Sequence, residues 1–175
     1  DAELTWRATP RQSLTLAFGH ARERAASTSY AQDVQRDNDA WVLAYAGQAG
    51  PWALQAELRH DENSVYGGVD TGRVGAALGL GGGWRVRAVL GSTFRAPSFN
   101  DLYYPWSSNP ALKPEESTSV NVGIAQYGEG WNWTFNAYES RIDQLIALDS
   151  TYTPYNIAKA RIRGAELTGF ASLAG

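Results

Sequence analysis

Apolar and polar residues alternate along several stretches of this 175-residue chain. Three of these stretches begin with a tryptophan directly after a tight turn, and they cover residues 52–60, 84–91 and 131–138. Residues 13–24 form a fourth stretch of the same kind. Successive side chains of an extended strand point to opposite faces, so a period of two residues predicts strands with one apolar face.

The segments between these stretches alternate in the same way and would pair with them. Partner strands are predicted at 39–48, 71–80 and 117–127, and a first and a last strand at 3–9 and 160–171. The sequence therefore predicts an all-β fold of roughly nine antiparallel strands. Each strand, at about 9 to 11 residues, is long enough to cross a bilayer when tilted.

The predicted connections differ in length between the two ends of the strands. One end has short turns rich in Pro and Gly, at 10–12, 49–51, 81–83 and 128–130. The other end has longer polar or aromatic segments near 26–38, 62–69, 95–116 and 143–157. Short turns on one side and long loops on the other are typical of transmembrane β-barrels, whose short turns face the periplasm.

The two faces of the predicted strands fit such a barrel better than a soluble sandwich. Trp52, Trp84 and Trp131 follow the short turns and would form an aromatic girdle at the membrane surface. The opposite faces carry large polar residues, namely Glu57, Arg59, Arg85, Arg87 and Asn132. A soluble sandwich would have shorter strands and a buried face richer in Ile, Leu and Phe.

The amino-acid composition argues against nucleic acid as a partner and favours contact with membrane lipid. The chain has 7 Trp and 9 Tyr but no Cys, and Trp and Tyr suit a boundary between hydrocarbon and water. A net charge of −3 offers no basic patch for nucleic acid. No apolar run approaches the roughly 18 residues of a membrane helix, and the mean hydropathy is −0.37. Outer-membrane lipid is the predicted environment.

Candidate catalytic and metal-binding groups are weak. The only histidines, His20 and His60, have no ligand-like spacing. Asp61, Glu62 and Asp70 could in principle offer oxygen atoms to Ca²⁺, although they lack EF-hand spacing. No serine lies in a nucleophile elbow or a recognisable triad. We expect no catalytic residues, no metal site and no cofactor, and therefore no enzyme.

Two motifs resemble segments of TonB-dependent outer-membrane receptors. Residues 91–116 read GSTFRAPSFNDLYYPWSSNPALKPEE, and residues 156–167 read NIAKARIRGAEL. The matching positions are Arg95, Ala96, Pro97, Asn109, Pro110, Leu112, Pro114, Glu115, Arg161, Gly164 and Glu166. The spacing, with an SRIDQLI strand end at 140–146, is most similar to that of the cobalamin-transporting members.

The resemblance implies that residues 1–175 are part of a larger barrel of about 22 strands, with the plug domain absent. It implies an active importer in the bacterial outer membrane that contacts TonB through the missing plug segment. Cobalamin is the first cargo that it suggests, with a ferric siderophore or haem as alternatives. The loop aromatics could contact the ligand or pack the loop upon itself, and they are Phe99, Tyr103, Tyr104 and Trp106. Arg161, Arg163 and Glu166 are expected to face inward, against a plug.

Two other functions stay open at this point. A passive porin or anchor of about eight strands that closes on itself would fit the length of the chain. A soluble sugar-binding β-domain with exposed Trp would also fit the alternation. The two motifs favour the importer over both.

Overall fold

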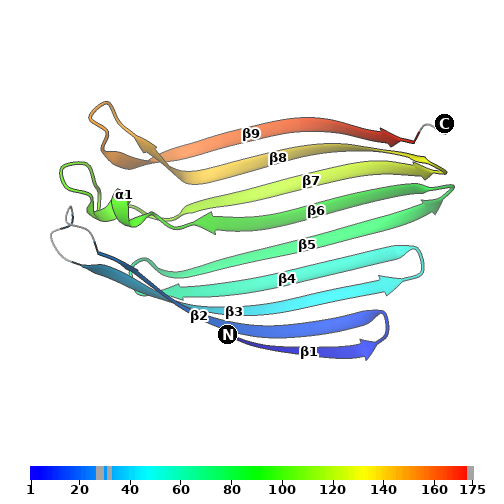
Figure 1. Cartoon of the computed structure of the whole chain (residues 1–175), viewed down its shortest axis with the longest axis horizontal. Coiled ribbons are helices and arrows are strands. Elements are labelled where there is room, and N and C mark those ends of the chain that lie inside the picture. Colours follow the sequence, from blue (N-terminus) through cyan, green and yellow to red (C-terminus); the bar gives the residue numbers. More distant parts are fainter. Residues whose placement is uncertain (27–29, 31–32, 173–175) are drawn as a thin grey trace.

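The computed structural model describes residues 1–26, 30 and 33–172, and they form one antiparallel sheet whose nine strands lie in sequence order (Figure 1). Each strand pairs with the strand that follows it. The strands are β1 Ala2–Thr9, β2 Gln12–Ala25, β3 Val34–Ala49, β4 Trp52–Asn63, β5 Gly67–Gly81, β6 Trp84–Arg95, β7 Glu115–Gly128, β8 Trp131–Leu148 and β9 Pro154–Ala171. One short helix, α1 (Phe99–Tyr103), lies between β6 and β7. The predicted all-β class and strand number are confirmed.

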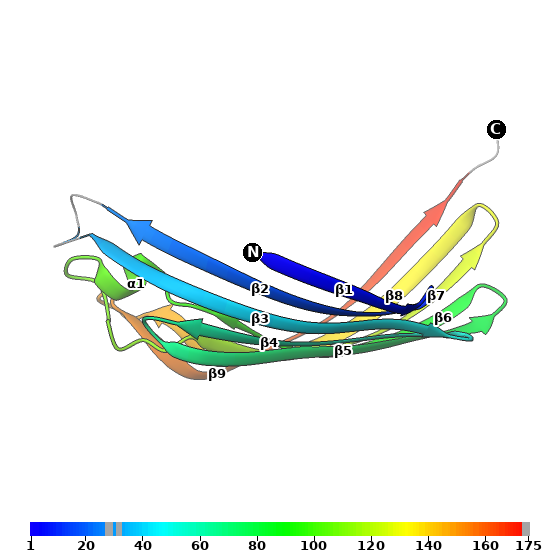
Figure 2. The same cartoon turned by 90° about the horizontal axis from the view of Figure 1, so that it is seen from below.

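The sheet is curved and open. Seen from below, it bends like a section of a cylinder wall, and β1 and β9 are its two edges (Figure 2). The sheet order of the described residues includes no pairing of β1 with β9, so these nine strands do not close into a small barrel by themselves. No helix among the described residues is long and apolar enough to cross a membrane.

The two ends of the sheet differ as the sequence predicts, but three of the four long loops are shorter than expected. Tight turns join β1 to β2, β3 to β4, β5 to β6 and β7 to β8 at one end, and α1 lies at the other end (Figure 1). However, the long loops expected at 62–69 and 143–157 are mostly strand, because only residues 64–66 and 149–153 lie between the strands. The loop expected at 26–38 is strand from Val34 onward, and its residues 27–29 and 31–32 lie outside the described residues. Polar residues there continue the ladder, as in the pairing of Glu62 with Gly68 and of Asn156 with Ile146. These residues are polar because they contact water. Because they are strand and not loop, the strands reach a length of 18 residues.

Strand register sorts the side chains into two faces. The outer face carries the apolar rows: Trp52, Leu58, Val74 and Leu90 lie on it, and Leu58 is 66% exposed. The inner face carries the polar rows, and Arg85 and Arg87 line a hollow on it with Ser13, Gln55 and Val89. A sheet with one exposed apolar face and one polar face is the arrangement of a membrane barrel wall.

The register also corrects one predicted orientation. Arg161 and Arg163 lie in the same row as Leu167, which pairs with Phe135 on the outer face. They therefore face outward. Glu166 pairs with Asn136 and faces inward, as expected. The error arose because the register of β9 is set by its pairing with β8, which the motif alone does not reveal.

Candidate functional site

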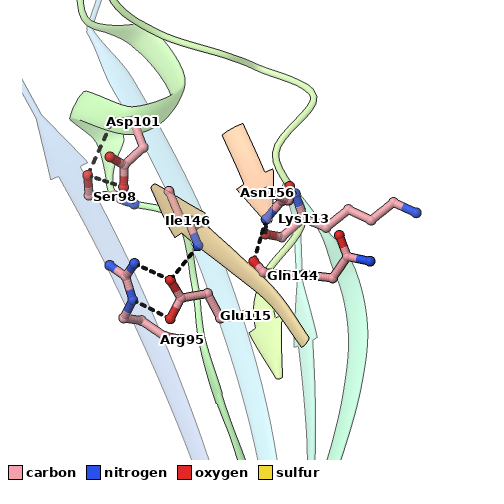
Figure 3. Close-up of polar contacts among 8 residues, drawn as sticks. All are labelled: Arg95, Ser98, Asp101, Lys113, Glu115, Gln144, Ile146 and Asn156. Carbon is pink, nitrogen blue, oxygen red and sulfur yellow. Dashed lines mark hydrogen bonds and ion pairs between the residues drawn. The ribbon is translucent and has the colours of Figure 1, made fainter. Parts of the chain in front are cut away.

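The longest connection of the described chain, residues 96–114 between β6 and β7, begins with a capped helical turn. Ser98 is the N-cap of α1, and its hydroxyl accepts a hydrogen bond from the Asp101 backbone N–H at 3.1 Å. The Asp101 carboxylate in turn accepts from the Ser98 backbone N–H at 2.8 Å (Figure 3). This reciprocal capping box satisfies donors that a helix start leaves free. A helix of five residues is thereby fixed at a position where the sequence pattern predicts only a loop.

An ion pair joins the two ends of this loop. Arg95, the last residue of β6, donates from Nε and Nη2 to the two carboxylate oxygens of Glu115, at 2.9 and 2.5 Å. Glu115 is the first residue of β7, is only 9% exposed, and also accepts from the Ile146 backbone N–H of β8 at 2.7 Å (Figure 3). Hydrogen bonds from the Arg95 guanidinium hold the pKa of Glu115 below its ordinary value, against the opposing effect of burial.

Asn109 organises the second half of the loop. Its side-chain oxygen accepts from the Ala111 N–H at 3.0 Å, and its carbonyl accepts from the Leu112 N–H at 3.3 Å. This is an Asx turn within a β-turn, with Pro110 in the second position of the β-turn. The Asn109 amide also donates to the carbonyl of Pro154 at 3.2 Å, which ties the loop to the start of β9.

Asn156 connects the two sequence motifs. Its side-chain oxygen accepts from the Lys113 N–H, and its amide donates to the Lys113 carbonyl, both at 3.0 Å. The same amide donates to the carbonyl of Gln144 at 2.6 Å (Figure 3). Gln144 has a positive φ of 58°, a conformation that non-glycine residues seldom adopt. One side chain thus joins the loop to both β8 and β9.

The beginning of the loop is held by a strand distant in the sheet. Arg36 of β3 donates to the carbonyl of Pro97 at 2.7 Å and lies over the Phe99 ring, 4.9 Å from its centroid. Because Arg36 is three strands away from β6, the loop extends across the inner face towards β3 at this end of the sheet. Contacts to β3 and β9 together hold the loop at the end of the sheet opposite the tight turns.

Three side chains within this connection are buried. Pro97 and Leu102 are less than 2% exposed, and Leu112 is 6% exposed. Two segments, FRAP (residues 94–97) and NPALKPE (residues 109–115), therefore anchor the loop. They do so through these buried side chains and through the hydrogen bonds of Arg95, Asn109 and Glu115. Ala96, Pro110 and Pro114 lie within the same ordered connection. The sequence showed the motif but not its partners on β3, β8 and β9.

The four loop aromatics divide into two pairs. Phe99 and Tyr103 stack with ring centroids 6.3 Å apart, and both are partly buried. Tyr104 is 44% exposed and Trp106 is 98% exposed. The first pair packs the loop, whereas the second presents aromatic surface to a ligand or to solvent. Trp106 also has a positive φ of 65°.

Gly164 of the second motif has a steric role. It lies directly opposite Tyr138 on β8, and a Cβ at this position would lie 2.4 Å from the Tyr138 ring. The ring covers the glycine, an arrangement that fills the space a missing side chain leaves in a strand. The inner face gains a second cross-strand contact where Arg87 of β6 donates to Asn136 of β8 at 2.7 Å.

The remaining candidates from the sequence are dispersed. Trp52, Trp84 and Trp131 are the first residues of β4, β6 and β8 and lie on the outer face next to the tight turns. Asp61 faces inward and accepts a hydrogen bond from the Arg59 guanidinium, whereas Glu62 and Asp70 lie beside His60 on the outer face. The three carboxylates therefore do not form one calcium site. Within the described ranges, no group of three or more acidic, His or Cys side chains is placed to hold a metal ion.

The sequence is similar to known proteins over almost its whole length. The family model described as "TonB dependent receptor-like, beta-barrel" matches residues 2–174. The vitamin B12 transporter BtuB of Photobacterium profundum is 38% identical over 154 residues, which are 83% of this chain and 25% of that protein. BtuB of Vibrio vulnificus is 33% identical over 166 residues, or 89% of this chain and 27% of that protein. The chain thus spans about a quarter of the length of these curated relatives.

Solved structures share the fold at low sequence identity. The siderophore receptor PirA from Pseudomonas aeruginosa matches with a TM-score of 0.87 and 21% identity, covering 94% of this chain and 35% of PirA. The FrpB iron transporter from Neisseria meningitidis matches with a TM-score of 0.80 and 10% identity, covering 99% of this chain and 32% of FrpB. Both likenesses concern the fold alone.

Proposed function

The chain belongs to the TonB-dependent receptor β-barrel family, and from this we propose that its protein imports a scarce nutrient through the outer membrane with energy delivered by TonB. Its location is the outer membrane of a Gram-negative bacterium, and the family consists of transporters and receptors, not enzymes. In the proposed mechanism the protein binds and gates its cargo without covalent chemistry. The described residues contribute one wall of the barrel and an ordered loop at its mouth.

We propose cobalamin as the cargo. The single observation that carries this proposal is the 38% identity to a vitamin B12 transporter over 83% of the chain. Ferric siderophore or haem receptors of the same family are the alternative. The likeness to siderophore and iron receptors at 21% identity or less concerns the barrel, whereas loop residues set the cargo.

The exposed loop aromatics are the proposed ligand contacts. Tyr104 and Trp106 project from a loop whose backbone is fixed at both ends by Arg95–Glu115 and by Asn156. A rigid loop presents aromatic surface at a low entropic cost, which favours the binding of a large planar or apolar ligand. Phe99 and Tyr103 support this loop by packing and are proposed to act through its shape.

The inner face is the proposed contact surface for a plug. Its hollow is lined by Arg85 and Arg87, and Arg87 donates to Asn136 of β8. Such polar walls stay hydrated or pair with a polar domain inside a barrel. TonB would then act through that plug segment, and the three girdle tryptophans would contact lipid at the periplasmic boundary.

Titration calorimetry on the full-length protein in detergent tests the cargo. Cyanocobalamin should bind saturably, and a ferric siderophore should give no binding heat. Trp106→Ala should weaken cobalamin binding by about tenfold, in the range of an exposed aromatic contact. Trp52→Ala, on the outer face, is the matched control and should leave the affinity unchanged. Siderophore binding without cobalamin binding would reject cobalamin and retain the importer.

A further inference from the structure

The outer face of β8 and β9 carries a cluster of arginines around one carboxylate. The strand register places Glu139 opposite Arg163 and Arg141 opposite Arg161. These four residues lie on the outer face, the same face of β8 and β9 as Phe135 and Leu167. We call Glu139, Arg141, Arg161 and Arg163 the arginine cluster. Since these side chains point away from the barrel interior, neither the cargo nor a plug accounts for them.

Charge within this cluster is unbalanced. Glu139 accepts hydrogen bonds from Arg141 and Arg163 at 2.7 Å each, and the Nε of Arg161 lies 3.7 Å from it. Three guanidinium groups thus share one carboxylate, and they are 66%, 60% and 52% exposed at Arg141, Arg163 and Arg161. Like charges directly opposite each other on a sheet are unfavourable, as are Arg141 and Arg161 here. A further anion would relieve this repulsion.

The cluster lies at the height of lipid headgroups. Arg141 is ten residues beyond Trp131, which marks the opposite boundary of the apolar face on β8. A rise of about 3.4 Å per residue and a tilt of about 40° place the Arg141 side chain roughly 26 Å above Trp131. The apolar band of an outer-membrane barrel is about 25 Å tall. Arg141 and its partner Arg161 therefore lie just beyond the hydrocarbon, on the side of the long loops, whereas Glu139 and Arg163, two residues nearer Trp131, lie at its edge.

Neighbouring outward rows at about this height are balanced or acidic. On β2 and β3, Arg22 pairs one to one with Asp37 at 2.5 Å. On β4 and β5, His60 lies beside Asp70 and Glu62. One row beyond the cluster, Asp143 and Glu116 are paired across β7 and β8, and Asp143 lies 3.9 Å from Lys159. Arg24 adds one more guanidinium to the outer face of β2, opposite Gln35, but among the described residues only the arginine cluster gathers three guanidinium groups around one carboxylate.

We propose that the arginine cluster binds a phosphate group of a phosphorylated glycolipid in the outer leaflet of the membrane. Arginine forks match phosphate oxygens in pairs, and basic pockets at the membrane surface bind anionic headgroups. The lipid chains would lie along the apolar part of the same outer face, over Ala137 and Ala165 and then over Phe135 and Leu167. Phosphate would then take over part of the hydrogen bonding that Glu139 alone now provides.

Native mass spectrometry of the full-length protein in detergent tests this proposal, with diphosphorylated lipid A as the probe. The double variant Arg141→Gln/Arg161→Gln should weaken lipid binding by about tenfold or more, because each basic residue near a membrane surface contributes about a fivefold effect. Glu139→Gln should strengthen binding, since it removes the competing carboxylate while keeping the side-chain size. Arg22→Gln, whose partner is a single aspartate, is the matched control and should bind as the wild type does.

The form of the lipid distinguishes the source of the phosphate. Lipid A whose phosphates have been removed should bind no better to the wild type than to the double variant. Inorganic phosphate at millimolar concentration should compete weakly, because it lacks the acyl chains. Equal binding of both lipids, or equal binding by the wild type and the double variant, would overturn the proposal. The Glu139→Gln result decides the case if the double variant fails to fold.

Discussion

Arg95 and Glu115 are joined by two hydrogen bonds, of 2.9 and 2.5 Å, at the point where the chain leaves β6 and enters β7. Nineteen residues lie between them in sequence, yet the pair closes that connection as a tight turn closes a hairpin. The pairing of β6 with β7 continues up to these two residues, because Arg95 lies opposite Glu115 in the sheet. The FRAP and NPALKPE segments are therefore the two halves of one clamp.

Breaking the clamp should loosen the loop and leave the barrel intact. We expect Glu115→Gln to lower the local stability of the loop by about 2 kcal/mol, because it removes charge-assisted hydrogen bonds from a nearly buried group. Hydrogen exchange of residues 96–114 in the full-length protein measures this loss. Glu116→Gln, a neighbour on the opposite face, is the control and should leave exchange unchanged. Unchanged exchange in Glu115→Gln would contradict the clamp.

The clamp should also depend on pH. Because the folded-state pKa of Glu115 is lowered, its ionised form stabilises the loop, and this contribution is fully present above the unfolded pKa of about 4.3. The contribution is lost as the pH falls through the lower folded-state value. Loop exchange, corrected for its intrinsic pH dependence, should therefore be constant from pH 7 to 5 and rise below about pH 4. The Glu115→Gln variant should lack this rise.

A side chain at Gly164 should displace the Tyr138 ring that covers it. Gly164→Ala places a Cβ 2.4 Å from the far end of the Tyr138 side chain, which is 43% exposed and has to swing away, and we expect it to destabilise the full-length barrel by about 1 kcal/mol. Denaturant unfolding of the detergent-solubilised protein measures the change. Adding Tyr138→Ala to Gly164→Ala should cost less than the sum of the two single variants. Strict additivity would show that the ring does not oppose the new methyl group.

Replacing Gln144 with glycine should not lower the stability of the protein. Its φ of 58° costs a non-glycine residue about 1 kcal/mol, and its carbonyl still accepts from Asn156 whatever its side chain. We expect Gln144→Gly to retain or slightly raise the stability, and Gln144→Val to lower it by more than 1 kcal/mol. Thermal unfolding of both variants compares them directly. A stabilising valine would refute the left-handed conformation.

Local chemistry made much of this structure predictable. Alternation located all nine strands, and Pro and Gly located the four tight turns, because both signals depend only on neighbouring residues. The same signals failed at 62–69 and 143–157, where polar strands continue beyond the apolar band. A polar residue that pairs across strands and a polar residue in a loop look alike in sequence.

The strand number, the apolar face and the segments that carry the family motifs follow from the order of the residues alone. The role of those motifs is visible only in the folded chain. Asn156 contacts Lys113 across 43 residues, and Arg36 contacts Pro97 across 61. Likewise, only the register of β9 against β8 turned Arg161 and Arg163 outward and brought them around Glu139. Periodicity is a property of neighbouring residues, whereas partner choice and register arise from contacts between strands far apart in the chain.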